Sequence, residues 1–198
     1  QKLTESTLVD AISFTGSVPV GKAIAASAIQ NLTRLQMEMG SKNALAIMDD
    51  ADLNLAVSLA LGGAFGGSGQ KCTASSRLVV HQSVHDEFVE KLVLGTKAMK
   101  VGHALEPETQ MGPVVSEQQL VENFNYVDLA KSEGAELLCG GVRLDMPTDG
   151  YYMSPGVFVG TKNDMRVNRE EMFAPLACVI SVDSYDEALH VVNDTNFG

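Results

Sequence analysis

Residues 8–32 read LVDAISFTGSVPVGKAIAASAIQNL, and the order of their properties decides the fold class. The first seven residues mix apolar and β-branched side chains, which is typical of a buried strand. A turn follows at residues 15–17, where Ser17 is placed to cap a helix and Pro19 fits the first helical turn. The following residues are rich in alanine and isoleucine and predict that helix. A strand, a glycine turn and a helix in succession are the building unit of α/β folds.

The same alternation of strand and helix continues through the rest of the chain. Further strands are predicted at 35–39, 43–48, 77–81, 135–141, 156–160 and 177–182. Further helices are predicted after Asp49, Asp50 and Asp52, after Ser83 as a cap, over 121–134, and over 184–194 with Ser184 as a cap. The expected fold class is therefore α/β, with a largely parallel sheet flanked by helices.

The composition is that of a globular protein and argues against two classes of partner. Hydrophobic residues make up 45% of the 198 residues and charged residues 20%, which supports a packed core. The formal net charge of −11 argues against nucleic acid, because a phosphate backbone recruits clustered Lys and Arg. No apolar run reaches the roughly 18–20 residues of a membrane span.

The cysteines and histidines predict neither disulfides nor a metal site. Three cysteines are widely spaced without a C-x-x-C pair, which favours a reducing, cytoplasmic setting. Cys139 and Cys178 lie in apolar, strand-like runs and are expected in the core. His81 and His85 have a metal-like spacing, but a strand end falls between them and no acidic third ligand accompanies them.

The stretch GGSGQKCTASS (66–76) places Cys72 where the backbone carries almost no bulky side chains. One interpretation is a flexible surface loop that happens to contain a thiol. The other is a nucleophile that a substrate or cofactor approaches closely, beside backbone N–H groups that favour the thiolate. A free cysteine is more often a small core residue, but the surrounding glycines favour the functional interpretation.

Glu38 lies between Met37 and Met39 in a predicted strand. A buried carboxylate there would hold its proton more tightly, which suits a general base near neutral pH. Simple strand alternation would instead place Gln36 and Glu38 together on an outward face. Both interpretations stay open.

Two further stretches are candidates for binding. GSVPVGKA (16–23) has the glycine spacing of a P-loop, but Ala23 stands where that motif needs Ser or Thr for magnesium, so ATP hydrolysis is not expected. Its helix N-terminus still suits a dinucleotide pyrophosphate, unless the glycines serve packing alone. In REEMFAPL (169–176), Phe173 is expected either to stack on a flat ring while Glu171 takes ribose hydroxyls, or to lie in the core beside a helix-terminal acid pair.

Four motifs, in this order, resemble those of the aldehyde dehydrogenase superfamily over nearly the whole chain. They are FTGSVPVG (14–21), EMGSKN (38–43), GQKC (69–72) and EEMFAP (170–175). The sequence departs from the family pattern at Met39, Ser41 and Ala174, where the family has Leu, Gly and Gly. The E-x-G-S-K-N variant is similar to the α-ketoglutaric semialdehyde dehydrogenase branch.

The resemblance implies a role for each motif. Cys72 would be the nucleophile and Glu38 the general base that activates water. The residues that would contact NAD or NADP are Gly16, Ser17, Gly21, Met39, Glu171 and Phe173. The substrate would be a small aldehyde, oxidised through a thiohemiacetal and a thioester on the cysteine.

The resemblance also implies a domain organisation. Residues 1–40 would be the C-terminal part of the NAD(P)-binding domain, and 41–198 a C-terminally incomplete catalytic domain. Because the chain begins at Gln1 and family members are longer, a fragment of a homo-oligomeric parent is expected. The alternative function is an isolated non-catalytic fragment or partner-binding domain with at most weak thiol esterase activity.

Overall fold

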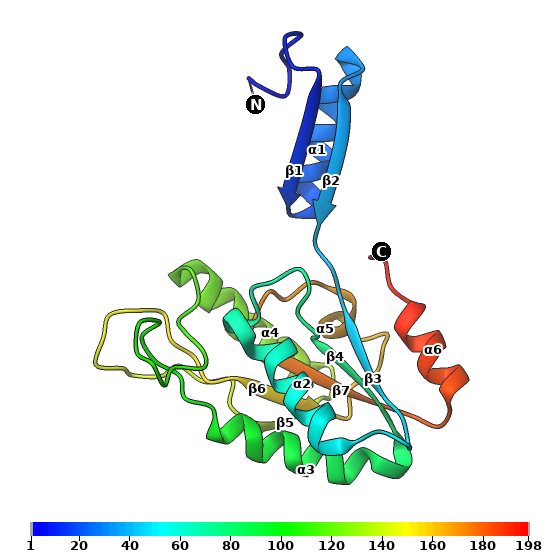
Figure 1. The fold of residues 1–198 in the computed structure, drawn as a ribbon, viewed down its shortest axis with the longest axis vertical. Coiled ribbons are helices and arrows are strands. Elements are labelled where there is room, and N and C mark those ends of the chain that lie inside the picture. Colours follow the sequence, from blue (N-terminus) through cyan, green and yellow to red (C-terminus); the bar gives the residue numbers. More distant parts are fainter. Residues whose placement is uncertain (1, 198) are drawn as a thin grey trace. The chain divides into compact units, whose positions relative to one another are not determined.

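The computed structural model describes residues 2–197, which fall into two compact units that divide between Ser41 and Lys42 (Figure 1). The N-terminal unit contains β1 (Ala11–Gly16), α1 (Val18–Ala28), the short 3-10 helix η1 (Ile29–Asn31) and β2 (Arg34–Met39). The C-terminal unit contains β3 (Ala44–Ile47), α2 (Leu53–Phe65), the 3-10 helix η2 (Gly66–Gly69), β4 (Arg77–His81), α3 (Gln82–Ala98), α4 (Glu117–Ser132), β5 (Glu136–Cys139), β6 (Gly156–Val159), α5 (Arg166–Arg169), β7 (Leu176–Val182) and α6 (Tyr185–Asn193).

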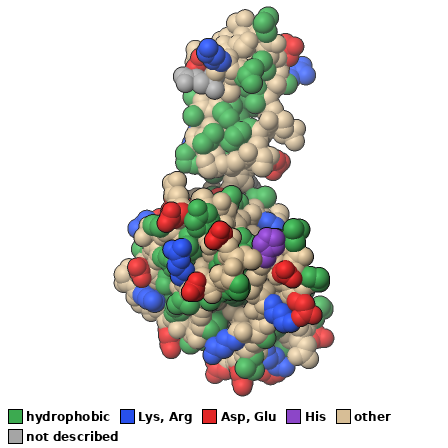
Figure 2. All heavy atoms as spheres, turned by 90° about the vertical axis from the view of Figure 1, so that its left-hand side faces the viewer, with side chains coloured by type: hydrophobic (Ala, Val, Ile, Leu, Met, Phe, Trp, Pro, Cys, Tyr) green, Lys and Arg blue, Asp and Glu red, His purple; other side chains and the backbone are tan. Residues whose placement is uncertain are grey.

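The N-terminal unit is the predicted strand–turn–helix followed by a second strand. β1 and β2 pair in parallel, with Thr15 opposite Glu38. Ser17 is the N-cap of α1 and a proline lies in its first turn, as predicted. Two strands and one helix cannot enclose a core, and Leu8, Ile29 and others are highly exposed. Figure 2 shows hydrophobic side chains across the visible face of this unit.

The C-terminal unit is built on a five-stranded sheet in the order β3-β4-β7-β6-β5. β3, β4, β7 and β6 are mutually parallel, and only β5 pairs antiparallel, with β6. The prediction of an α/β fold with a largely parallel sheet is confirmed.

Alternation along the strands sends side chains into helical layers on both faces of this sheet. Leu78 and Val80 of β4 belong to the cluster that α2 and α3 cover. Val79, between them, packs with β7 and α6. A third cluster joins β6 and β7 to α4. Covered on both faces, the central strands carry nearly continuous apolar sequence, as buried parallel strands do.

Two of the predicted helix starts are wrong. Ser83 does not cap α3, because the helix already begins at Gln82 and the His81 imidazole accepts from the Ser83 N–H instead. α4 begins at Glu117 rather than at 121, since Ser116 accepts from the Gln119 N–H and caps it there. The predicted caps at Asp52 and Ser184 are confirmed.

Within residues 2–197, no helix has both the length and the apolar character needed to cross a membrane.

Candidate active site

Three segments that carry sequence motifs meet at one edge of the five-stranded sheet. Residues 42–43 directly precede β3, residues 66–76 precede β4, and residues 170–175 precede β7. Because β3, β4 and β7 are adjacent and parallel, their amino ends lie at the same edge. The topology therefore gathers segments that are about 100 residues apart in sequence.

The loop before Cys72 has an unusual and firmly held backbone. Gly67, Ser68 and Gly69 have φ angles of 63°, 58° and 67°, which is three left-handed residues in succession. The Ser68 hydroxyl donates to the Gly112 carbonyl over 2.8 Å. The Val115 N–H donates to the Gln70 side-chain oxygen over 3.0 Å. These contacts oppose the interpretation of a freely flexible loop, and a left-handed serine marks strain that is often found at functional sites.

Cys72 itself lies in a tight turn at the surface. The Ala74 N–H donates to the Lys71 carbonyl over 3.0 Å, so Cys72 and Thr73 are the two central residues of a β-turn. The Cys72 side chain is exposed. Among residues 2–197 no acceptor pairs with the Cys72 N–H. An accessible thiol thus lies next to an available backbone donor.

The other two cysteines are buried, as predicted. Cys178 on β7 has no exposure, and burial raises the pKa of its thiol to about 11. Burial also raises the pKa of Cys139. Since the thiolate is the nucleophilic form, of the three cysteines only Cys72 is suited to react with an external carbon.

The acidic pair before β7 divides into two environments. Glu170 accepts hydrogen bonds from Arg166 at 2.7 Å and from the Tyr126 hydroxyl at 3.2 Å. The Arg166 bond holds the pKa of Glu170 below its ordinary value. Burial, followed by the Glu170 charge, raises the pKa of Tyr126 to about 12. Glu170 is thus held by Arg166 and Tyr126, and Glu171 next to it is half-buried.

Phe173 is in a strained conformation and faces outward. Its φ is 52°, a left-handed value that is rare for an aromatic residue, and 38% of the residue is exposed. The acid pair does follow a short helix, α5, as one of the two interpretations predicted. That interpretation also placed Phe173 in the core, and this part of it is wrong. The next two residues, Ala174 and Pro175, are buried.

The Cys72 loop and the 170–175 loop interlock through backbone. A Cβ built on Gly69 would collide with the Ala174 carbonyl oxygen and would lie 2.9 Å from the Pro175 nitrogen. Only glycine permits this approach at a positive φ. Gln119 of α4 also donates to the Phe173 carbonyl over 3.4 Å. The segment that carries the nucleophile candidate is therefore packed on the segment that carries Glu171 and Phe173.

Lys42 is a buried ammonium at this edge that the sequence patterns did not single out. Only 2% of the residue is exposed, and its Nζ has no hydrogen-bond partner within the described part of the chain. Burial lowers the pKa of Lys42 to about 8, while the carboxylates of Glu171 and Glu170 oppose that shift. A buried amine whose pKa is shifted by desolvation beside specific charged partners is typical of a functional site.

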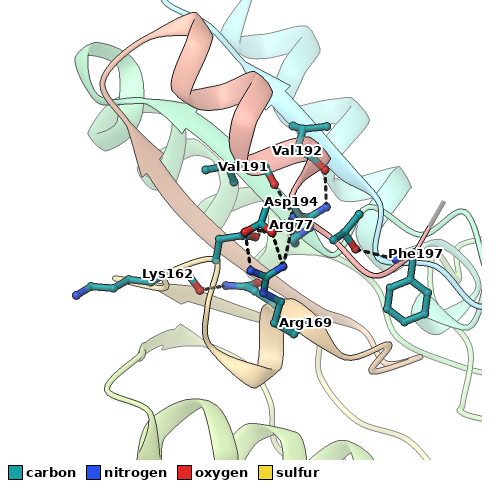
Figure 3. A network of polar contacts seen from close by, with 10 residues as sticks. Arg77, Lys162, Arg169, Val191, Val192, Asp194 and Phe197 are labelled. Atoms are coloured by element: carbon teal, nitrogen blue, oxygen red, sulfur yellow. Dashed lines mark hydrogen bonds and ion pairs between the residues drawn. The ribbon is translucent and has the colours of Figure 1, made fainter.

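Arg77 anchors the segment that holds Lys42. Its Nε donates to the Lys42 carbonyl over 3.0 Å, and its guanidinium donates to the carbonyls of Val191 at 2.9 Å and Val192 at 3.1 Å. Figure 3 shows this guanidinium at the C-terminal end of α6, where the helix dipole favours a cation. The start of β4, the entry to β3 and the end of α6 are thereby joined.

Asp194 extends the same network to α5. It accepts from Arg169 at 3.0 Å and from the Asn163 amide at 2.9 Å (Figure 3). The Arg169 hydrogen bond holds the pKa of Asp194 below its ordinary value. Arg169 directly precedes the acidic pair, so the network also holds the start of the 170–175 loop.

In the N-terminal unit, the glycine turn suits a phosphate-bearing ligand. Ser17 is exposed, and its side chain makes no capping bond with the described residues. Gly21 is buried, and a Cβ there would collide with the Met39 sulfur. Gly21 therefore lets α1 pack closely on β2, while the first-turn N–H groups of the helix stay available at its positive end. Met39 lies beneath Gly21 and is half-buried.

Glu38 is exposed on β2, as is Gln36, while Met37 and Met39 are half-buried. The alternating interpretation of this strand is confirmed, and the buried one is wrong for this unit. This carboxylate at the end of β2 is accessible to a ligand.

Within the described residues, no three His, Cys, Asp or Glu side chains are grouped so as to hold a metal ion.

Comparison with known proteins shows which family the chain belongs to. The model of the aldehyde dehydrogenase family matches residues 1–198. The chain belongs to the aldehyde dehydrogenase family. The resemblance drawn from its four motifs is confirmed.

Individual aldehyde dehydrogenases show how far the similarity extends. The α-ketoglutaric semialdehyde dehydrogenase of Bacillus subtilis (strain 168) is 42% identical over 200 residues, which covers 100% of this chain and 41% of that protein. The betaine aldehyde dehydrogenase of Rhizobium johnstonii is 40% identical over 188 residues, covering 94% of this chain and 39% of that protein. The chain thus spans about two fifths of the length of these relatives.

A solved aldehyde dehydrogenase has the same fold. The crystal structure of betaine aldehyde dehydrogenase from Staphylococcus aureus in complex with NAD⁺ matches with a TM-score of 0.96 and 38% sequence identity. The match covers 98% of this chain and 39% of that chain.

Proposed function

We propose that this chain forms part of an enzyme that oxidises a small aldehyde to a carboxylic acid with NAD⁺ or NADP⁺. One structural observation carries the proposal: the loop of the exposed Cys72 is interlocked at Gly69 with the loop of Glu171 and Phe173. Because the chain spans about two fifths of its relatives, the activity is assigned to the whole protein that contains residues 1–198.

In this mechanism Cys72 attacks the aldehyde carbon and forms a thiohemiacetal. The developing oxyanion would accept a hydrogen bond from the unpaired Cys72 N–H, and such preorganised donors are among the largest contributions to catalysis. A bound NAD(P)⁺ would supply the acceptor for the hydride that leaves this carbon. The remaining thioester is hydrolysed by water, with Glu38 as the general base. The balance is aldehyde, water and NAD(P)⁺ to acid, NAD(P)H and a proton.

Gly16 and Ser17 would bind the pyrophosphate at the N-terminus of α1, where Gly21 and Met39 support the close packing of that helix. Glu171 would accept hydrogen bonds from the nicotinamide ribose. The outward Phe173 ring would pack near the nicotinamide.

The domain assignment and the cellular setting follow from the same proposal. Residues 1–40 are proposed as part of the NAD(P)-binding domain and 41–198 as catalytic domain. The absence of any disulfide among the three cysteines supports a reducing, cytoplasmic setting. The homo-oligomer expected from the resemblance stays a prediction.

Glu38→Gln tests the proposed chemistry, because it keeps the side-chain shape and removes the base. Assayed in the whole protein with NAD⁺ or NADP⁺ and with α-ketoglutaric semialdehyde or betaine aldehyde, the variant is expected to lose turnover by about 10²-fold or more. A burst of reduced cofactor and an acyl group on Cys72, seen by mass spectrometry, should remain.

Gln36→Ala provides the matched control, since Gln36 is exposed on the same face of β2. This variant should retain wild-type turnover. Unchanged turnover in Glu38→Gln would remove Glu38 from the mechanism, and a wild-type protein that oxidises no aldehyde would overturn the proposed function.

Phe173→Gly separates a cofactor role from a structural one. Glycine adopts a positive φ without strain, and this relief of about 1–2 kcal/mol offsets its higher chain entropy and lost packing. The free energy of unfolding in urea is therefore expected to change little. The KM for the cofactor should rise roughly fivefold, because a ring contact contributes about 1 kcal/mol.

Phe173→Leu keeps the strained backbone and an apolar side chain but removes the ring. It should raise the cofactor KM as Phe173→Gly does. A KM that neither substitution changes would exclude Phe173 from the cofactor site.

A further inference from the structure

The side chain of Asn43 contacts the backbone of the proposed nucleophile. Its Nδ2 donates a hydrogen bond to the carbonyl oxygen of Cys72 over 2.8 Å. We propose that Asn43 is a positioning residue, whose carboxamide fixes the peptide group after Cys72 and thereby the direction of the thiol. This inference rests on the proposed function, in which Cys72 is the nucleophile.

The geometry of the turn explains why this one bond matters. The direction of the Cys72 Cα–Cβ bond depends on the two peptide groups that flank the residue. The preceding peptide is held by the turn itself, since the Lys71 carbonyl accepts from the Ala74 N–H at 3.0 Å. The following peptide is the central one of the β-turn, and it takes no part in the hydrogen bond that closes the turn. The hydrogen bond from Asn43 to the Cys72 carbonyl restrains this central peptide.

The central peptide of a β-turn is also the one that rotates most between turn types. Types I and II differ by a rotation of this peptide, with ψ of the first central residue changing from about −30° to about +120°. For Cys72 such a rotation would redirect the carbonyl and change the backbone ψ angle on which the rotamer of the thiol depends. A donor aimed at the carbonyl oxygen opposes that rotation.

Asn43 is itself held on a rigid support. The Arg77 N–H donates to the Asn43 carbonyl over 3.2 Å, and Ala44 pairs with Arg77 in the β3–β4 ladder. The Arg77 side chain fixes the neighbouring Lys42 carbonyl and is fixed in turn at the end of α6 (Figure 3). The restraint on Cys72 is thus continuous with the buried sheet.

Alkylation of the 198-residue chain tests the inference without requiring turnover. The chain is treated with iodoacetamide at pH 7, and the rate at each cysteine is read by peptide mass spectrometry. Asn43→Ala and Asn43→Leu both remove the donor, and Leu keeps the branched shape if Ala destabilises the fold. We expect the alkylation rate of Cys72 to fall at least threefold in each variant. A thiol whose direction is no longer fixed points toward the protein part of the time, where the reagent has less access to it.

The chain offers internal and matched controls. Cys139 and Cys178 are buried, so a general loosening of the fold would raise their rates, whereas a local loss of direction leaves them unchanged. Asn54→Ala makes the same substitution at an exposed asparagine whose side chain contacts Lys91 instead, and should alkylate as wild type does. An unchanged or raised Cys72 rate in both Asn43 variants overturns the inference.

Turnover separates this inference from the proposed function. In the whole protein, Asn43→Ala should lower kcat at least tenfold and leave the cofactor KM unchanged, since misplacing a reacting group lowers the rate without removing binding contacts. An active wild type with an equally active Asn43→Ala variant contradicts the positioning role. A wild type without activity contradicts the proposed function instead, and the alkylation rates still decide whether Asn43 directs Cys72.

Discussion

Replacing Cys72 by serine is expected to abolish aldehyde oxidation by the whole protein while leaving the fold of this chain intact. A serine hydroxyl is far less ionised and less nucleophilic than a thiol near neutral pH. Loss of a covalent nucleophile lowers turnover by about 10⁴-fold or more in comparable enzymes. Because Cys72 is exposed, the free energy of unfolding should change by less than about 0.5 kcal/mol. Steady-state reduction of NAD(P)⁺ and urea denaturation measure the two effects.

Cys139→Ala and Cys178→Ala are the controls for this prediction. Both cysteines lie in hydrophobic clusters of the C-terminal unit, so each substitution should lower stability slightly and retain activity. Turnover that survives in Cys72→Ser would remove the nucleophile from the proposed mechanism. Turnover that is lost equally in all three variants would indicate a structural effect rather than a chemical one.

The fold was largely predictable from local sequence patterns. The run at 8–32 specifies β1 and α1 because a β-branched run, a glycine turn and an alanine-rich segment each favour one local structure. The wrong helix starts arose where two side chains competed for one role. Serine is a preferred N-cap residue, but here the helix begins before Ser83. His81 is the N-cap, and its imidazole accepts the hydrogen bond from the Ser83 N–H. Ser116 and Gln119 form a capping pair that the pattern S-x-x-Q could have revealed.

The residues of the candidate site were partly predictable, whereas their arrangement was not. Glycines around Cys72 and the acid–aromatic run at 170–175 are visible because such residue types are unusual together. Nothing in the sequence indicates that β7 pairs with β4, which lies about 100 residues earlier in the chain. That pairing brings the two loops to one edge of the sheet. Periodicity specifies strands, but long-range pairing depends on packing that local patterns do not encode.

Lys42 and Asn43 show the same limit at the level of single residues. A lysine beside an asparagine is ordinarily a solvated surface pair. Here both residues directly precede β3, where Lys42 is buried and Asn43 donates to the Cys72 carbonyl. Sequence alone offered one signal, the resemblance of EMGSKN to an active-site motif, and it pointed at Glu38 rather than at these neighbours.

Gly69→Ala is expected to destabilise the C-terminal unit by about 3 kcal/mol or more, because it separates the two loops of the site. A left-handed backbone costs a residue with a Cβ about 1–2 kcal/mol, and overpacking adds about 1–3 kcal/mol. At Gly69 the φ is 67° and the new methyl group would meet the Ala174 carbonyl, which belongs to backbone and cannot rotate away.

Gly160→Ala isolates the backbone contribution, since Gly160 has the same φ of 67° and a methyl group added there would meet no atom within 4 Å. It should cost only about 1–2 kcal/mol, and the difference between the two variants in urea denaturation measures the contact between the loops. Gly69→Ala should also lower turnover of the whole protein by displacing Cys72 from Glu171 and Phe173, while Gly160→Ala retains it. Equal unfolding free energies for both variants would show that the interlock contributes nothing, and the proposed site would lose the contact that assembles it.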